Sequence, residues 1–261
     1  MYIDTHMHLE PDDDVAGLMK RAVDAGVTRL VAVGGSESMN TAALQAAATH
    51  GEVFSAAVAF DRHVAEIGGA GDVAGLVEAV RRQLDAPGVV AVGETGLDYH
   101  YSPETATEQK ALFGAQLDLA RERELPIIIH SREAEADILA MLRAHRAAWT
   151  HPYDRLGVLH CFTGNADMAT ELVELGLFIS FSGILTFRNA DSLRAAAAVV
   201  PDEWLLIETD TPYLAPVPHR GKPNEPAYLP DVARCLAEVR GVSCEHIAAI
   251  TTANACRLFG L

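Results

Sequence analysis

Six side chains of the types that bind metal ions are spread along the chain, each close to the end of a short apolar run. A lone histidine is more often a surface or core residue than a ligand, but histidines and carboxylates that converge on one pocket can hold an ion. Neutral imidazoles suit Zn, Mn or Fe, and carboxylates also tolerate Mg, so this set predicts divalent-metal chemistry. The residues are His6, His8, Glu94, His130, His160 and Asp210.

The spacing of His6 and His8 favours a shared ion. Side chains alternate along an extended segment, so both imidazoles point to the same side of the chain. Glu94, at the end of another apolar run, could bridge two ions through its two oxygens. Two divalent ions about 3.5–4 Å apart activate water and clamp the oxygens of a scissile phosphate or ester. We therefore expect two divalent ions per chain, either Zn²⁺, Mn²⁺ or Mg²⁺, because the sequence leaves the metal open.

Short β-branched or apolar runs alternate with longer amphipathic segments, the pattern of βα units around a parallel sheet. A chain of 261 residues has the usual length of one α/β barrel. We expect a single TIM-like (β/α)₈ barrel domain over residues 1–261, with the metal site at the C-terminal ends of its strands. An open doubly wound sheet is the alternative, although no GxGxxG follows the first run. The expected strands are Met1–Asp4, Arg29–Val33, Val53–Ala59, Val89–Gly93, Ile127–His130, Gly157–His160, Leu177–Ser180 and Leu205–Glu208.

Helical segments and one irregular loop complete this pattern. The segments Val15–Ala25, Glu108–Glu124 and Glu133–His145 show helical periodicity. The segment Thr211–Pro226 is instead rich in Pro, Gly and charged residues. We expect an ordered loop there, lying over the mouth of the barrel.

The charge of the chain limits the ways in which it could bind a nucleic acid. The formal net charge of −16 repels polyanions at long range, which argues against a global grip on duplex DNA. Attraction would have to be local, supplied by bound metal and a few arginines. Aromatic residues make up only 6% of the chain, so an extended base-stacking groove is not expected either.

Targeting and membrane signals are not evident in the sequence. No apolar run is long enough to span a bilayer, and no basic segment followed by an apolar one stands at the start. The four cysteines form no CxxC pair and are expected to be reduced thiols. These features predict a cytoplasmic protein without membrane association, and nothing implies an obligate protein partner.

Five blocks of the sequence resemble the signature motifs of the TatD family of metal-dependent deoxyribonucleases, which belongs to the amidohydrolase superfamily. The similarity runs in order through the whole chain, and the blocks together are far more specific than any one alone. They are Asp4-Thr5-His6-Met7-His8-Leu9, Gly93-Glu94-Thr95-Gly96-Leu97-Asp98-Tyr99, Ile129-His130-Ser131-Arg132, His160-Cys161-Phe162-Thr163-Gly164 and Glu208-Thr209-Asp210-Thr211-Pro212-Tyr213-Leu214.

The resemblance implies a role for each candidate ligand. One pair of histidines would hold a first ion and another pair a second, with a glutamate between them. An aspartate would bind the first ion and orient or deprotonate the attacking water, which makes it and the bridging glutamate the catalytic residues. In this chain the pairs are His6 with His8 and His130 with His160, the glutamate is Glu94, and the aspartate is Asp210.

The resemblance also places substrate contacts at the rim of the site. His63, Arg132 and Arg220 lie where the family is expected to hold substrate phosphate. One block departs from the family pattern, since the usual His-Pro-His triplet is replaced by Asp61-Arg62-His63. The aspartate adds negative charge where phosphate should approach, and the adjacent arginine could compensate for it.

These observations favour a metal-dependent nuclease that cleaves phosphodiester bonds of DNA, at single-stranded or frayed ends that fit a barrel-mouth pocket. DNA as the substrate is implied by the family resemblance alone. The residues alone indicate hydrolysis of a phosphoester, ester or amide, so the closest alternative is an ester, lactone or amide hydrolase of the amidohydrolase superfamily, for example one acting on aminoacyl-tRNA esters. A non-catalytic metal-binding module is less favoured, because such a site would not require the proton-handling Asp210.

Overall fold

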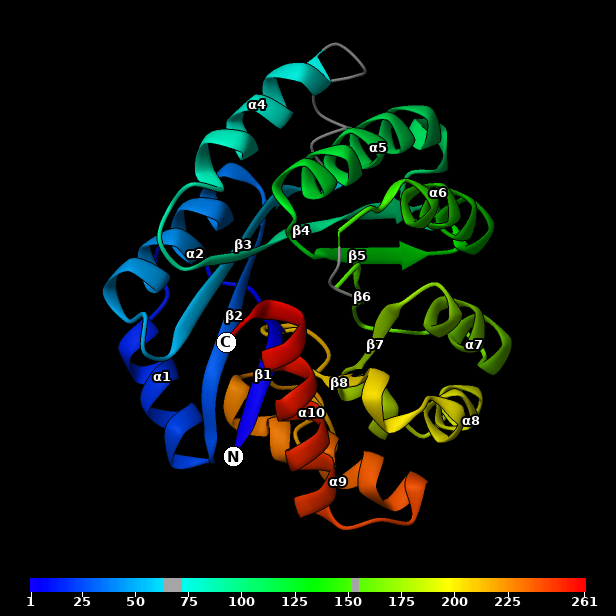
Figure 1. Ribbon diagram of the computed structural model, residues 1–261. Coiled ribbons are helices and arrows are strands. Elements are labelled where there is room, and N and C mark those ends of the chain that lie inside the picture. The colour runs from blue at the N-terminus through cyan, green and yellow to red at the C-terminus, as the bar shows by residue number, and fades with distance from the viewer. Residues whose placement is uncertain (63–71, 152–154) are drawn as a thin grey trace.

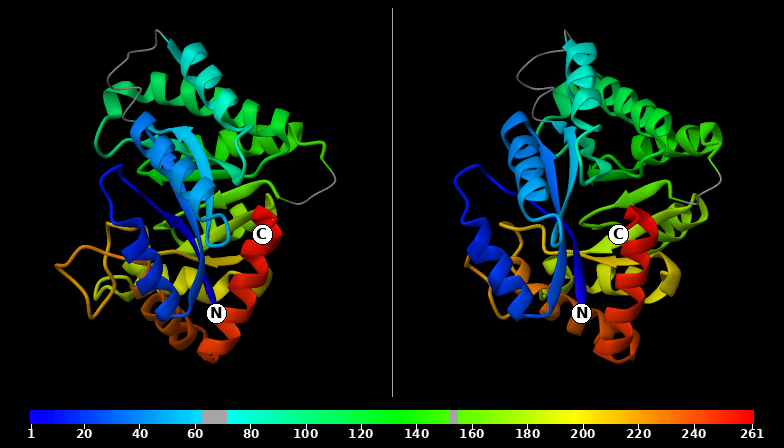
Figure 2. Two further views of the ribbon diagram at one scale, coloured as in Figure 1. Left: turned by 90° about the vertical axis from the view of Figure 1, so that its left-hand side faces the viewer. Right: turned by 60° about the vertical axis from the view of Figure 1, so that its left-hand side comes forward.

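Eight parallel strands form one sheet in the chain order β1 to β8, with helices packed around its outside (Figures 1 and 2). The computed structural model describes residues 1–62, 72–151 and 155–261. The strands are β1 (Tyr2–Met7), β2 (Val27–Gly35), β3 (Phe54–Phe60), β4 (Val89–Asp98), β5 (Ile127–Arg132), β6 (Gly157–Leu159), β7 (Leu177–Phe181) and β8 (Leu205–Ile207). The α-helices are α1 (Val15–Asp24), α2 (Glu37–Thr49), α4 (Val73–Gln83), α5 (Ala106–Arg123), α6 (Glu135–Ala148), α7 (Ala166–Glu174), α8 (Asp191–Val199), α9 (Leu229–Arg240) and α10 (Cys244–Phe259).

The sheet closes on itself between β1 and the segment that follows β8. The backbone N–H of His8 donates to the carbonyl of Thr211 at 2.8 Å, and that of Asp210 donates to the carbonyl of His6 at 2.9 Å. These hydrogen bonds join the first and last strands of the ring. The structure therefore has the predicted TIM-like (β/α)₈ architecture, and the doubly wound open sheet is excluded.

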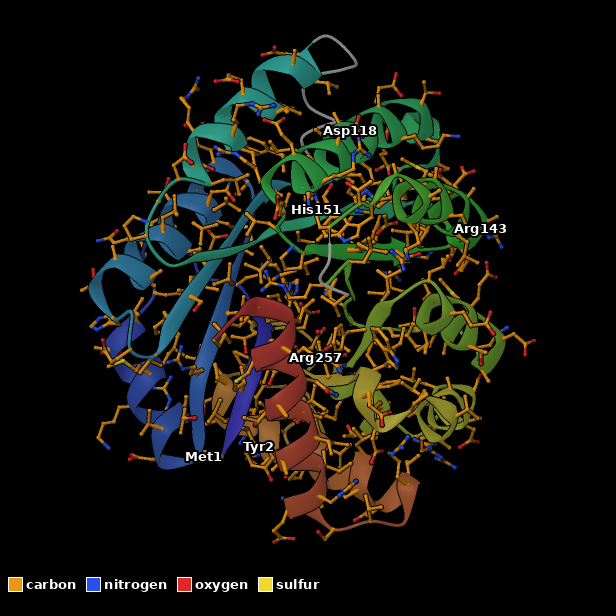
Figure 3. The ribbon with its side chains drawn as sticks, in the orientation of Figure 1. Met1, Tyr2, Asp118, Arg143, His151 and Arg257 are labelled. Atoms are coloured by element: carbon orange, nitrogen blue, oxygen red, sulfur yellow. The ribbon has the colours of Figure 1, made fainter. Side chains whose placement is uncertain are left out.

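The N-terminal end of the barrel is closed by apolar side chains. Ala255, Leu258 and Phe259 of α10 pack in one buried cluster with inward-facing strand residues such as Ile3. Arg257, on the same helix, lies over the Phe178 ring at 4.9 Å (Figure 3). Since this end is sealed by a helix, access to the barrel interior is left to the opposite end, where the strands finish.

Most expected elements are present, with some boundaries displaced. The three expected helices correspond to α1, α5 and α6. Several strands continue further than the apolar runs that predicted them, most of all β1, which extends to Met7, and β4, which extends to Asp98. The expected loop Thr211–Pro226 contains no helix until the short 3₁₀ turn that begins at Pro226. No helix in the described part of the chain combines the length and apolarity needed to cross a membrane.

Candidate metal centre and active site

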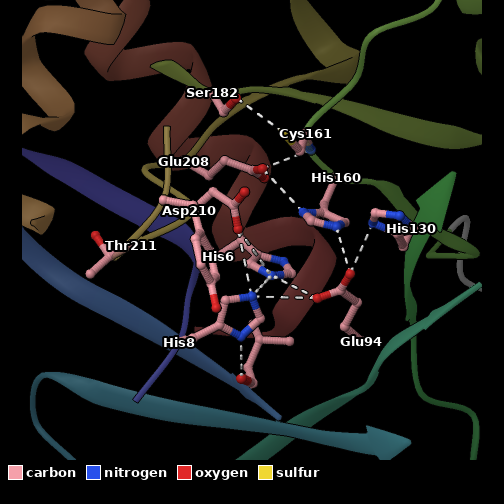
Figure 4. A network of polar contacts seen from close by, with 12 residues as sticks. His6, His8, Glu94, His130, His160, Cys161, Ser182, Glu208, Asp210 and Thr211 are labelled. Carbon is pink, nitrogen blue, oxygen red and sulfur yellow. Dashed lines mark hydrogen bonds and ion pairs between the residues drawn. The ribbon is translucent and has the colours of Figure 1, made fainter. Parts of the chain in front are cut away.

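All six predicted ligands lie at the C-terminal end of the barrel and come together in one cluster (Figure 4). His6 lies within β1, rather than after it, and Glu94 lies inside β4, rather than at its end. Both strands continue beyond their apolar runs, because the residues that follow still pair with the neighbouring strand. Glu94 and His6 are consequently held by strand backbone on both sides, with 6% and 0% of their surface exposed.

Glu94 lies at the centre of the cluster, between two pairs of imidazoles. Its Oε2 is 3.5 Å from His6 Nε2 and 3.4 Å from His8 Nε2. Its Oε1 is 3.1 Å from both His130 Nδ1 and His160 Nε2. Each carboxylate oxygen thus faces one histidine pair, the arrangement needed for a carboxylate that is shared between two ions.

Asp210 adds a second carboxylate on one side only. Its Oδ1 lies 3.5 Å from His8 Nε2 and 3.9 Å from His6 Nε2. We refer to His6, His8 and Asp210 as the first half-site and to His130 and His160 as the second, with Glu94 shared. Only the first half-site has a carboxylate of its own among the predicted ligands.

The position of Asp210 is fixed by the strand that begins the barrel. Asp4, buried in β1, accepts hydrogen bonds from the Thr209 N–H at 2.9 Å and from the Thr209 hydroxyl at 2.6 Å. Asp210 follows immediately with a φ of 61°, a left-handed conformation that aspartate tolerates better than most residues. In this conformation its carboxylate faces His6 and His8.

A further set of contacts orients the imidazoles. His8 Nδ1 lies 2.9 Å from the carbonyl oxygen of Val33, and His130 Nε2 lies 3.2 Å from Asp98 Oδ2. His160 Nδ1 lies 3.2 Å from Glu208 Oε1. A metal-ligating histidine normally uses its second nitrogen in this way, which fixes the tautomer and the ring orientation.

Asp98 and Glu208 are the functional residues that the sequence analysis missed. Both stand in the quoted sequence blocks, but neither received a role. Their closeness in sequence to predicted ligands could have pointed to both. Asp98 is four residues after Glu94, and Glu208 is two residues before Asp210. Acidic residues that are buried this deeply, both with none of their surface exposed, need partners of opposite charge or strong donors.

The buried polar atoms of the cluster fit a metal site. Among the described residues, His6 Nδ1 and Glu208 Oε2 have no hydrogen-bond partner. His6 Nε2 and His8 Nε2 approach to 3.2 Å, and two ring nitrogens at this distance require a proton or a cation between them. Three overlapping groups have donor atoms close enough to share an ion: His6 with His8 and Asp210, His6 with His160 and Glu208, and Glu94 with His130 and His160.

The electrostatics of the cluster differ from one imidazole to the next. Burial lowers the pKa of His6 to about 3, with a further contribution from His160. Burial also acts against protonation of His8, but the contact with Asp210 and the charge of Glu94 raise its pKa to about 9. In the absence of a cation the first half-site therefore holds a proton that a bound metal would have to displace.

The predicted substrate contacts lie in different surroundings. Arg132, at the end of β5, is exposed, and its guanidinium lies 4.7 Å from the centre of the Tyr101 ring. Arg220 lies 3.7 Å above the Phe187 ring and donates to a backbone carbonyl at 2.9 Å. His63 lies outside the described residues. A cavity of about 270 Å³ opens beside His8, bordered by the expected mouth loop and by α1.

A closed ring of parallel strands, whose C-terminal ends gather imidazoles around a shared carboxylate, defines the class of a metal-dependent hydrolase barrel. The family model described as TatD related DNase matches residues 3–260. The chain belongs to the TatD family, which confirms the resemblance seen in its sequence motifs.

Named relatives agree with this assignment. YcfH of Escherichia coli strain K12, described as an uncharacterized metal-dependent hydrolase, is 52% identical over 183 residues, covering 70% of this chain and 67% of YcfH. The 3′-5′ ssDNA/RNA exonuclease TatD of Klebsiella pneumoniae strain 342 is 40% identical over 191 residues, covering 71% of each. The crystal structure of YJJV, a TatD homologue from E. coli K12, has a TM-score of 0.88 at 30% identity and covers 100% of this chain and 98% of that one. The chain is a metal-dependent hydrolase.

We predict that metal uptake releases protons from the first half-site. Since a metal ligand must be a neutral imidazole and the pKa of His8 is about 9, apparent metal affinity should rise as the pH is raised from 7 toward 9. Titration of Mn²⁺ into weakly buffered protein at pH 7.5, with a pH indicator present, measures the release directly.

Two variants check the source of those protons. His8→Asn should release fewer protons than the wild type. His246→Asn, which removes a surface histidine 2.8 Å from Asp202, should release as many as the wild type. Metal uptake without proton release would contradict this account of His8.

Proposed function

We propose that the chain is a nuclease that hydrolyses phosphodiester bonds of DNA with two divalent ions, Zn²⁺, Mn²⁺ or Mg²⁺. The first half-site and the second would each hold one ion, and Glu94 would contribute an oxygen to both. The observation that carries this proposal is the position of the two Glu94 oxygens, each within 3.5 Å of a different histidine pair. When bound, such ions lower the pKa of water and polarise the oxygens of a phosphodiester.

Asp210 would handle the proton of the attacking water. Its side chain is 10% exposed, and its Oδ1 faces the His6 and His8 rings. Backbone hydrogen bonds across the barrel closure hold its main chain in place, so only the short aspartate side chain has to be oriented. We assign Asp210 the role of general base, and Glu94 that of the shared ligand.

The surroundings of the cluster support an anionic substrate. Arg132 offers an exposed guanidinium at the end of the strand that carries His130, and guanidinium groups bind phosphate through paired hydrogen bonds. Arg220 and His63 remain proposed substrate contacts from the family pattern. The exonuclease named among the relatives acts on single-stranded nucleic acid, which supports single-stranded or frayed DNA ends as the substrate. The proposal needs no obligate protein partner.

Product analysis on end-labelled oligonucleotides tests this function. We expect the purified protein to shorten single-stranded DNA faster than the matching duplex, to lose this activity with a chelator, and to regain it when Mn²⁺ or Mg²⁺ is restored. A lactone and an aminoacyl ester should be assayed with the same preparation. If either of these is hydrolysed while the DNA stays intact, the protein is an ester or lactone hydrolase and not a nuclease.

A second prediction separates proton transfer from metal retention. Asp210→Asn should fold, keep an ion at the second half-site, and lose about 10²–10⁴ in rate, the usual contribution of a general base. Metal content and single-turnover rate should be measured on the same samples. Asp167→Asn, which alters an exposed aspartate of α7, serves as the matched control. If metal-loaded Asp210→Asn turns over at nearly the wild-type rate, the aspartate does not take part in the proton transfer.

A further inference from the structure

Arg62 brings a positive charge to the edge of the second half-site. The residue lies two positions after the end of β3. Its side chain is only 10% exposed, with Nε 3.2 Å from Asp98 Oδ2. Its Nη1 lies 3.3 Å from His130 Nε2. Because guanidinium groups stay protonated in proteins, this charge is a permanent feature of the site.

The two half-sites differ in charge, and Arg62 adds to that difference. The first half-site has the Asp210 carboxylate as a ligand of its own. The nearest carboxylate to His130, apart from the shared Glu94, is that of Asp98, and its charge is offset by the ion pair with Arg62. Glu208 does not restore the balance, because its carboxylate lies within reach of a His6 nitrogen as well as a His160 nitrogen.

We propose that Arg62 weakens metal binding at the second half-site, so that the first fills with a divalent ion at a much lower metal concentration than the second. This inference rests on the ligand assignment proposed above. Two effects act in the same direction. The guanidinium repels a dication in a buried setting where screening by water and salt is weak. It also forms an ion pair with the Asp98 carboxylate. This pairing weakens the contact through which Asp98 would otherwise make His130 a more basic ligand.

A purely structural role for Arg62 would have the opposite signature. If the guanidinium served only to hold Asp98, and through it the His130 ring, then its loss would disorder the second half-site and weaken metal binding there. Under the present proposal the loss of Arg62 strengthens binding at that half-site. The direction of the change therefore distinguishes the two roles without any measurement of turnover.

The test is a titration of the chelator-treated full-length chain with Mn²⁺, following free and bound ion by electron paramagnetic resonance. We expect the wild type to bind two ions in two separate phases. Arg62→Gln should tighten the second phase by about tenfold or more, which corresponds to one unit charge removed at this range in a partly buried site, and leave the first unchanged. Arg62→Lys keeps the charge and should retain the weak second phase.

Arg143→Gln is the matched control, because it removes an arginine that is ion-paired with Glu171 on the outer helices (Figure 3). It should bind both ions as the wild type does. Equal affinities in the wild type, or a second phase that Arg62→Gln weakens or leaves unchanged, would overturn the inference while the proposed function stands. A wild type that binds no Mn²⁺ would overturn the proposed ligand assignment itself.

Discussion

A single buried carboxylate organises the active end of this barrel. Glu94 presents one oxygen to His6 and His8 and the other to His130 and His160. These histidines come from three different strands or their ends, so the contacts at Glu94 can form only when the ring of strands is complete. The site can therefore form only in the folded barrel, because its side chains come from strands that are far apart in the sequence.

The scaffold stabilises this concentration of polar groups in several ways. Bringing imidazoles and carboxylates into a buried cluster costs free energy unless each one is paired. Here the second nitrogen of three of the imidazoles contacts a carboxylate or a backbone carbonyl, while Asp4 holds the segment that carries Asp210. At the other end of the barrel α10 buries an apolar cluster, which keeps the strands together without using polar groups.

The barrel, and the convergence of the six histidine and carboxylate side chains at one end of it, could be predicted from the sequence because both follow from short-range patterns. Each strand is an apolar run, and each ligand lies close to one. The predicted boundaries were furthest off at β1 and β4. There His6 and Glu94 continue the strand as polar residues, and a run of apolar residues does not show where hydrogen bonding in the sheet stops.

Other features could not be read from the sequence because they depend on long-range geometry. The pairing of Asp98 with His130 joins residues 32 positions apart, and that of His160 with Glu208 joins residues 48 apart. Arg62 was expected to compensate for its neighbour Asp61, yet the structure also brings it to Asp98 and His130. Whether a charged side chain turns inward depends on the space between strands, which composition and periodicity do not encode.

The most direct test of this account is the number of divalent ions bound by Glu94→Gln, measured by equilibrium dialysis and elemental analysis. An amide has only one oxygen and no charge, so the variant should fail to hold two ions at metal concentrations that load the wild type with two. Glu37→Gln, which changes an exposed glutamate in the first turn of α2, should still bind two. Two ions bound to Glu94→Gln with unchanged affinity would contradict the central role of this carboxylate.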